Sequence, residues 1–239
     1  MRIPSQFAKR MRTLFNRLRR ESGAVPDEGL TDPAEQLILS ILATDANTRR
    51  ARGALHGLLE EMIDFNELRV TPAAELADLL EPNVKGAPEK AQAIVGSLSW
   101  LFNKFDTMDL SGLREQQQSA LLATFETIPE CPDHARKAML LLSFGVPVFP
   151  VDQQMLDYLK VAEVLPEEVA AAEAQHYVER QLKAAEVREF YLLVKAASES
   201  AAPPAKPKAK AVKKTAAKSK TAKTAATARK KTTAPRSRK

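Results

Sequence analysis

The stretch that decides the fold is residues 128–152, which read IPECPDHARKAMLLLSFGVPVFPVD. It begins with a short proline-containing turn and continues through apolar residues at helical spacing to Gly145, a favourable C-cap for that helix. A run of valine and proline then leads to Asp152, a favourable N-cap for another helix. The stretch therefore predicts a tight turn between two helices, followed by a single carboxylate at the start of a third.

Helical spacing of apolar residues continues on both sides of this stretch. Glycine is scarce, with 8 residues in 239, and strand-like alternation of polar and apolar residues is hard to find. The expected helices lie near residues 7–18, 33–42, 46–62, 72–80, 88–105, 113–126, 134–144, 152–160, 167–183 and 186–197. We therefore predict an all-α chain, with a compact multi-helix domain over residues 1–200 whose core spans about 30–197.

Residues 201–239 differ from the rest of the chain. They are low-complexity Lys/Ala/Thr/Pro, with 14 Lys+Arg, no acidic residue and no large apolar residue beyond Val212. Such a segment cannot bury enough surface to offset chain entropy, so we expect a disordered tail. Its composition is similar to that of linker-histone and bacterial histone-like tails, and it predicts DNA contacts through basic residues. These include Lys213, Lys214, Arg229, Lys230 and Lys231.

The net charge of +6 conceals an uneven distribution of charge. Residues 1–200 hold 22 Lys+Arg against 30 Asp+Glu, a net of −8, although residues 1–20 hold 7 basic residues and no acidic one. An acidic domain is repelled by a duplex unless its basic side chains cluster, so the tail is expected to carry most DNA binding. The basic helix near 7–18 is either a solvated helix or one that faces phosphates.

Other features limit the classes of function. Cys131 is the only cysteine, so neither a disulfide within the chain nor an iron–sulfur cluster held by four thiolates can form. His56, His134 and His176 lack ligand spacing, and we expect no metal and no cofactor. The sequence shows no membrane-span pattern and no signal-peptide core. We expect a reducing compartment, with the protein cytoplasmic and nucleoid-associated, or nuclear in a eukaryote; the oligomeric state stays open.

Three landmarks together point to a known family. They are LILSILATDANTRRA at residues 37–51, KGAPEKAQAI at 85–94, and the opening stretch with its Phe-Gly-x-Pro turn and terminal Val-Asp. In this order and spacing, residues 32–197 resemble the helix-hairpin-helix (HhH-GPD) DNA glycosylase superfamily, in particular endonuclease III. The resemblance implies a helical glycosylase fold, base-excision repair and duplex DNA as the partner.

The hairpin departs from the family pattern, which reads Leu-Pro-Gly-x-Gly. The family glycines let backbone N–H groups approach a DNA phosphate. Here Glu130 and Pro132 occupy the glycine positions; Glu130 adds a negative charge and Pro132 has no N–H to donate. The turn is either purely structural, with Pro132 opening the next helix, or a weakened phosphate contact.

The resemblance also places candidate catalytic residues. The position of the nucleophilic lysine of bifunctional members falls on His134, whose imidazole cannot form the Schiff base that permits strand cleavage. Lys137, one helical turn further on, is the alternative nucleophile, while His134 otherwise reads as a satisfied, partly exposed helix residue. Asp152 matches the catalytic aspartate, which would stabilise a cationic sugar or activate the attacking group; it can equally serve as an N-cap.

The DNA-facing surface of the folded domain can be placed by the same alignment. Leu42 replaces the glutamine that fills the gap left by a flipped base, and is either an apolar wedge or a core residue. Thr44 and Asp45 follow it and precede a basic group. The expected basic groups are Arg49, Arg50 and Arg52 in one patch, and Arg114, Arg136 and Lys137 in another.

Three functions fit these observations. The first is a monofunctional DNA N-glycosylase that acts through Asp152 and has no lyase step. The second is a non-catalytic DNA-binding relative that keeps the fold. The third is a nucleoid- or chromatin-associated architectural protein that depends on its basic tail. We favour a DNA-binding protein of the glycosylase fold, at most monofunctional in catalysis.

Overall fold

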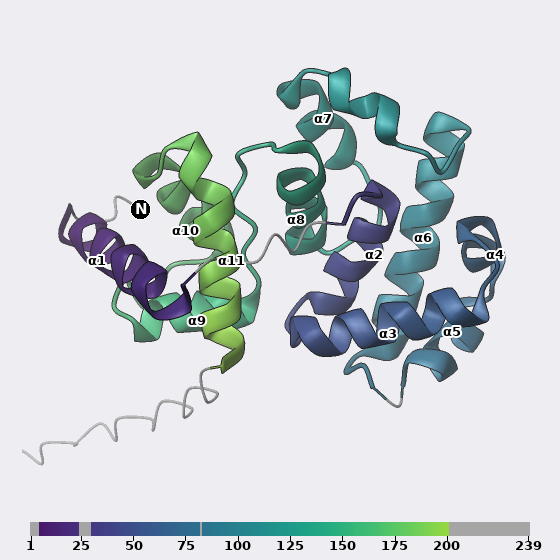
Figure 1. Ribbon diagram of the computed structural model, residues 1–239, viewed down its shortest axis with the longest axis horizontal. Helices are drawn as coiled ribbons and strands as arrows, with labels where there is room; N and C mark the ends of the chain where they lie inside the picture. The colour runs from purple at the N-terminus through teal and green to yellow at the C-terminus, as the bar shows by residue number, and fades with distance from the viewer. Residues whose placement is uncertain (1–4, 24–29, 82, 201–239) are drawn as a thin grey trace, which may run out of the picture. The chain divides into compact units, whose positions relative to one another are not determined.

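The structure is a computed structural model, and it describes residues 5–23, 30–81 and 83–200. Across these ranges it contains eleven α-helices, one 3₁₀ helix and no strand, which confirms the all-α prediction (Figure 1). The α-helices are α1 (Ser5–Ser22), α2 (Pro33–Ala43), α3 (Thr48–Glu61), α4 (Phe65–Val70), α5 (Ala73–Leu80), α6 (Ala87–Phe105), α7 (Gln118–Phe125), α8 (Asp133–Phe144), α9 (Gln153–Val161), α10 (Ala171–Gln181) and α11 (Ala184–Ser200); the 3₁₀ helix η1 spans Ser111–Glu115.

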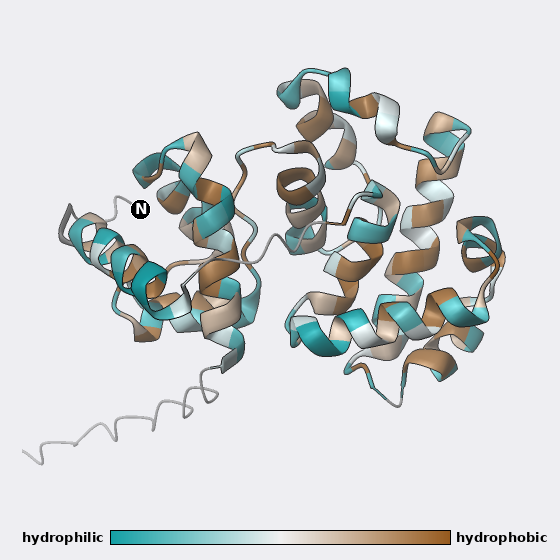
Figure 2. Ribbon diagram, viewed as in Figure 1, coloured by the Kyte–Doolittle hydropathy of each residue, from teal (hydrophilic) through white to brown (hydrophobic). Residues whose placement is uncertain are grey.

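Two hydrophobic cores hold these helices, and α8 contributes to both. One core gathers α2 to α7 against Ala135, Met139 and Leu140 of α8. The other gathers α1, α9, α10 and α11 against Ala138 and Leu141 on the other side of α8. In Figure 1, α8 stands between the two groups of helices, and Figure 2 shows apolar residues along α2 and α8. Residues that project from the ends of α2, α8, α9 and α11 can therefore meet at the boundary of the two cores.

Helix α1 belongs to the second core and is held there by both apolar and charged contacts. Its apolar stripe is buried, and Phe15 packs edge-on against Phe190 of α11, with ring centroids 5.1 Å apart. Arg12 pairs with Glu186 at 2.8 Å, and Arg19 pairs with Glu189. Because these arginines face carboxylates of this chain, much of the basic face of α1 is used within the protein rather than left open to a phosphate.

The predicted helix ends are confirmed at three positions. Asp32 caps α2 by accepting from the N–H of Ala34 at 2.7 Å, and Asp152 caps α9 in the same way. Gly145 ends α8 at φ 67°, and the next residue, Val146, donates its N–H to the carbonyl of Leu140 at 3.1 Å. The left-handed glycine turns the chain so that this N–H reaches a carbonyl in the last part of the helix.

Two helix predictions were wrong in detail, and one prediction lies outside the described residues. Helix α4 was not predicted, because its six residues are too few to show a clear periodicity. The single helix expected near 113–126 is instead η1 followed by α7. The predicted tail at 201–239, with Lys213, Lys214, Arg229, Lys230 and Lys231, is outside the described part of the chain.

Candidate functional site

The hairpin between α7 and α8 keeps the backbone shape that glycine would favour. Glu130 adopts φ 57°, in the left-handed region that side chains other than glycine occupy at a cost. Its carboxylate accepts a hydrogen bond from Nε2 of Gln92 at 3.1 Å. Pro132 precedes α8, offers no side-chain cap and has no N–H, so the turn lacks one of the two backbone donors expected from two glycines.

The basic residues that follow the hairpin are occupied by local partners. Arg136 donates to the carbonyl of Glu126 at 2.5 Å and to Asp133 at 3.0 Å. Lys137 pairs with Asp133 at 2.6 Å and also donates to Gln175 of α10. The structure therefore ties both residues to the hairpin and α10, and Lys137 is not part of the group around Asp152.

Asp152 lies at the N-terminus of α9 with a fully buried carboxylate. Its Oδ1 accepts from the N–H of Met155 at 2.8 Å, and its Oδ2 accepts from the N–H of Asp45 at 3.1 Å. Oδ2 also accepts from Nζ of Lys195 at 2.7 Å, and the Asp152 side chain has 0% of its surface exposed. The structure shows the N-cap that was predicted for Asp152, since its carboxylate accepts from the first turn of α9; its catalytic role stays a prediction.

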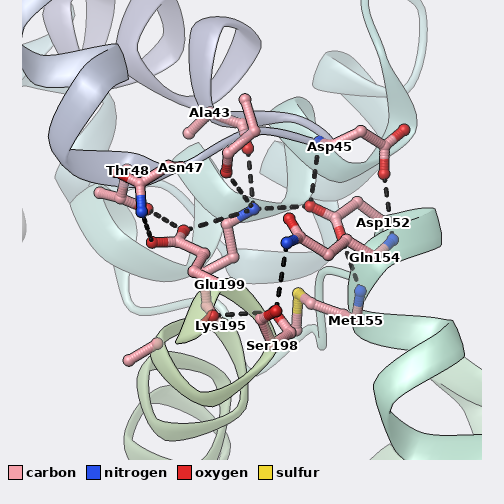
Figure 3. Close-up of polar contacts among 12 residues, drawn as sticks. Ala43, Asp45, Asn47, Thr48, Asp152, Gln154, Met155, Lys195, Ser198 and Glu199 are labelled. Atoms are coloured by element: carbon pink, nitrogen blue, oxygen red, sulfur yellow. Dashed lines mark hydrogen bonds and ion pairs between the residues drawn. The ribbon is translucent and has the colours of Figure 1, made fainter. Parts of the chain in front are cut away.

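Lys195 of α11 is the main charged partner of this carboxylate. Figure 3 shows its Nζ among oxygens from three segments. Besides Asp152, it donates to the carbonyls of Ala43 at 2.8 Å and Ala46 at 3.2 Å, and it lies 3.6 Å from Glu199. The Lys195 side chain is only 6% exposed, so this ion pair is shielded from water.

His134, which the sequence predicts to stand at the position of the nucleophilic lysine, is buried rather than partly exposed as predicted. Its Nδ1 lies 3.1 Å from Oγ1 of Thr44 and its Nε2 lies 3.3 Å from the hydroxyl of Tyr191. Because the single hydroxyl hydrogen of Thr44 goes to the carbonyl of Ser40, Nδ1 must donate to Thr44, which leaves Nε2 to accept from Tyr191. His134 is therefore the neutral Nδ1–H tautomer.

The charge states of this group follow from burial and from its partners. Burial lowers the pKa of His134 to about 4, while nearby Asp152 favours and Lys195 opposes the imidazolium. Burial alone would raise the pKa of Asp152, but attraction to His134 and Lys195, together with hydrogen bonds from Lys195 and Met155, holds it below its ordinary value. Since His134 is neutral near pH 7, Lys195 is the cation that balances Asp152. The side chains of Thr44, His134, Asp152, Tyr191 and Lys195 are called the Asp152 cluster below.

A second lysine holds the same end of α2. Lys90 of α6 donates to the carbonyls of Leu42 at 2.7 Å and Thr44 at 3.0 Å. Burial lowers its pKa, with Asp45 opposing that shift. Helices end with unpaired carbonyls and a partial negative charge, so Lys90 and Lys195 together stabilise the C-terminus of α2.

The remaining predicted DNA-contact residues lie in different environments. Leu42 is 1% exposed in the first core, so its core alternative is the one that the structure shows. Thr44 is partly buried, and Asp45 is exposed but uses its N–H on Asp152 and its Oδ1 on the N–H of Gln154. Arg49 and Arg50 are exposed in the first turn of α3.

Three residues of this site were not predicted from the sequence: Lys90, Tyr191 and Lys195. Lys195 interrupts the apolar run FYLLVKAASES, and it follows Tyr191 by four residues and Val187 by eight. Those three positions share one helix face, so a lysine there falls in the buried register of α11. A charged residue in a buried register is the signal that could have identified it.

A cavity of about 400 Å³ opens beside Lys195. It is lined by Gln36 and Ser40 of α2, Arg49 of α3, and Lys195 and Glu199 of α11, among others. Among the described residues, no group of three or more His, Cys, Asp or Glu side chains is placed to hold a metal ion. The same part of the chain contains no helix that is both long and apolar enough to cross a membrane.

Comparison with known proteins identifies the fold. The sequence matches no family model and no curated protein. The structure is similar to a trapped covalent endonuclease III–DNA intermediate (TM-score 0.63, 15% identity, covering 79% of this chain and 84% of that one). It is also similar to a thermostable thymine-DNA glycosylase (TM-score 0.60, 17% identity, covering 85% of this chain and 92% of that one). A third similar structure is H. pylori 3-methyladenine DNA glycosylase, MagIII, bound to 1,N6-ethenoadenine (TM-score 0.59, 15% identity, covering 82% of this chain and 98% of that one). The described part of this chain has the helix-hairpin-helix DNA glycosylase fold.

Proposed function

We propose that this protein binds duplex DNA through the glycosylase fold and its basic tail, and that it neither excises bases nor cleaves strands. The observation that carries this proposal is the state of Asp152, whose carboxylate is fully buried and paired with Lys195 at 2.7 Å. A carboxylate assists glycosidic bond cleavage by facing the sugar as positive charge develops there. In this protein the Asp152 carboxylate is instead paired with the ammonium group of Lys195.

The absence of a strand-cleavage step rests on two other residues. Cleavage through a Schiff base requires an amine that can attack the sugar. His134 has no such amine and is held by Thr44 and Tyr191. Lys137 has an amine, but it is paired with Asp133 away from the Asp152 cluster.

The assignment of DNA as the partner rests on the fold and on charge. Endonuclease III, which shares this fold, has been solved both as a covalent intermediate with DNA and as a non-covalent complex with it. The acidic glutamate and the proline of the hairpin weaken the usual phosphate contact. Residues 201–239 supply 14 positive charges, enough for a strong, sequence-independent attraction to duplex phosphates.

A second candidate function is a monofunctional DNA N-glycosylase. It is favoured by one observation, which is that Asp152 sits directly before α9 with a second carboxyl group, that of Asp45, at the same helix end. For this candidate, Lys195 would have to leave Asp152 when DNA binds.

The two candidates differ in a direct assay. The full-length protein is incubated with duplexes carrying oxidised, alkylated, deaminated or mismatched bases, with and without borohydride. The proposal predicts duplex binding, no released base and no trapped covalent adduct. Base release that Asp152→Asn abolishes would establish the monofunctional enzyme, and an adduct that Lys137→Ala abolishes would establish a lyase.

A further inference from the structure

The ammonium group of Lys195 has no donor left to offer. A lysine ammonium has three N–H groups and no acceptor. The three go to Ala43 O, Ala46 O and Oδ2 of Asp152, at 2.8, 3.2 and 2.7 Å. An ammonium that is saturated in this way has no lone pair with which to attack a sugar. Lys195 therefore acts as a charge and not as a nucleophile.

The position of Lys195 joins three separate parts of the chain at the Asp152 carboxylate. Its own helix, α11, is the last one described, while its partners lie at the end of α2 and the start of α9 (Figure 3). Asp45 and Met155 supply the other two donors to the carboxylate, and both are backbone N–H groups that cannot be withdrawn without unfolding a helix end. Lys195 is the one side chain among the donors, so it alone can be removed while the backbone stays in place.

Lys195 also separates the carboxylate from open space. It lines the cavity of about 400 Å³ between α2, α3 and α11, and it contacts Asp152 with the same side chain. Truncating this side chain would extend the cavity to the carboxylate. The space gained would be next to a buried negative charge, which attracts a small cation.

We propose that Lys195 is a resident counter-ion that closes Asp152 to a cationic ligand, so that α11 holds the glycosylase site shut. This inference rests on the proposed function, because it states how the absence of base excision arises. It identifies the ligand class that the opened site would take, namely a small ammonium ion or a sugar that carries positive charge. The other titratable groups at this position are Glu199, 3.6 Å from Nζ of Lys195, His134, whose Nε2 lies 4.0 Å from Oδ2 of Asp152, and Asp45 and Lys90.

Rescue by a small ammonium ion tests the counter-ion role. Lys195→Ala is prepared in the full-length protein, and its thermal midpoint is measured with increasing n-propylammonium chloride, which replaces the missing side chain. We expect a saturable rise in the midpoint, no rise with n-propanol or equal sodium chloride, and no response in the wild-type protein. The matched control is Lys195→Ala combined with Asp152→Asn, which should lose the response because the negative charge is gone. A non-saturable effect, or one that persists in the double variant, would overturn the inference.

A pair of modified duplexes tests access from DNA. One duplex carries a pyrrolidine abasic analogue, which is cationic, and the other carries the neutral tetrahydrofuran analogue. The wild-type protein should bind the two with a ratio near one, while Lys195→Ala should prefer the pyrrolidine duplex by about tenfold, the effect of one charge-assisted hydrogen bond. Asp152→Asn in the same background should return the ratio to one.

The outcomes separate this inference from the proposed function. A wild-type preference for the pyrrolidine duplex would contradict both, since Asp152 would already be open. No gain of preference and no ammonium rescue in Lys195→Ala would contradict the counter-ion role alone. If Lys195→Ala folds only with n-propylammonium present, that dependence supports the counter-ion role; Lys195→Gln, which keeps hydrogen bonding without charge, then serves for the duplex comparison.

Discussion

Asp45 forms hydrogen bonds with Asp152, which is 107 residues away in the sequence, and with the backbone next to Asp152 at the start of α9. The N–H of Asp45 donates to Oδ2 of Asp152 at 3.1 Å, and Oδ1 of Asp45 accepts from the N–H of Gln154 at 3.1 Å. Asp45 adopts φ 51°, a left-handed conformation that turns its N–H toward the Asp152 carboxylate. The turn after α2 and the start of α9 are thus fixed to each other without any ligand.

The Asp152–Lys195 pair should show strong energetic coupling. Lys195→Met or Asp152→Asn alone should lower the free energy of unfolding by roughly 3 kcal/mol, because each leaves a buried charge or donor unpaired. The double variant should cost much less than the sum of the singles, with a coupling of about 1–3 kcal/mol. Urea unfolding of the four proteins measures the cycle, and additive losses would show that the two residues act independently.

The pKa of His134 predicts a stability that depends on pH. In the folded protein this pKa is about 4, against an ordinary value of 6.5, so the unfolded chain binds the proton more tightly. The His134 contribution should be fully present above pH 6.5 and should fall by about 3 kcal/mol as the pH drops from 6.5 toward 4.

This dependence can be assigned by comparing variants. His134→Gln should remove this part of the acid destabilisation, measured as the difference in unfolding free energy from wild type at each pH. His176→Gln is the matched control, since the His176 side chain is 77% exposed, and the acid destabilisation assigned to His134 should persist in it. A wild-type profile in His134→Gln would mean that His134 does not titrate as described.

The left-handed turn at Glu130 predicts a stabilising substitution. Glu130→Gly should raise the free energy of unfolding by about 1 kcal/mol, because glycine adopts φ 57° without strain, and this gain exceeds the entropy that glycine adds to the unfolded chain. Glu126→Gly is the control: Glu126 has φ −60°, so the same change there should be destabilising. Equal effects at the two positions would exclude backbone strain as the cause.

Much of the fold could be predicted from the sequence because its determinants are local. Asp32, Gly145 and Asp152 are each recognisable as helix-end residues from their neighbours alone. The 3₁₀ segment η1 was missed because 3₁₀ geometry is too short to produce a hydrophobic repeat.

The candidate site was harder to predict because its main contacts are distant in sequence. Lys195 lies 43 residues from Asp152 and 152 from Ala43, and only the packing of α11 brings them together. The burial of His134 similarly depends on Thr44 and Tyr191, which lie on two other segments. The ion pairs of the α1 arginines could not be predicted, since their partners Glu186 and Glu189 are more than 160 residues away in the sequence.

The basic tail should dominate affinity for duplex DNA. Deleting residues 201–239, with their 14 positive charges, should weaken binding at moderate salt by on the order of 100-fold and flatten the salt dependence. Fluorescence anisotropy over a salt series measures both quantities. A full-length variant with the tail lysines and arginines changed to glutamine is the control for length, and it should behave like the deletion. Unchanged affinity after deletion would place DNA binding on the folded domain.

The most direct test of the account is single-turnover base release with the full-length protein in excess over lesion-containing duplexes. Wild-type protein and Asp152→Asn should give the same result, with no release above the protein-free control after prolonged incubation. Release by the wild-type protein that Asp152→Asn removes would contradict the account, because it would show that the Asp152 carboxylate reaches a sugar despite Lys195.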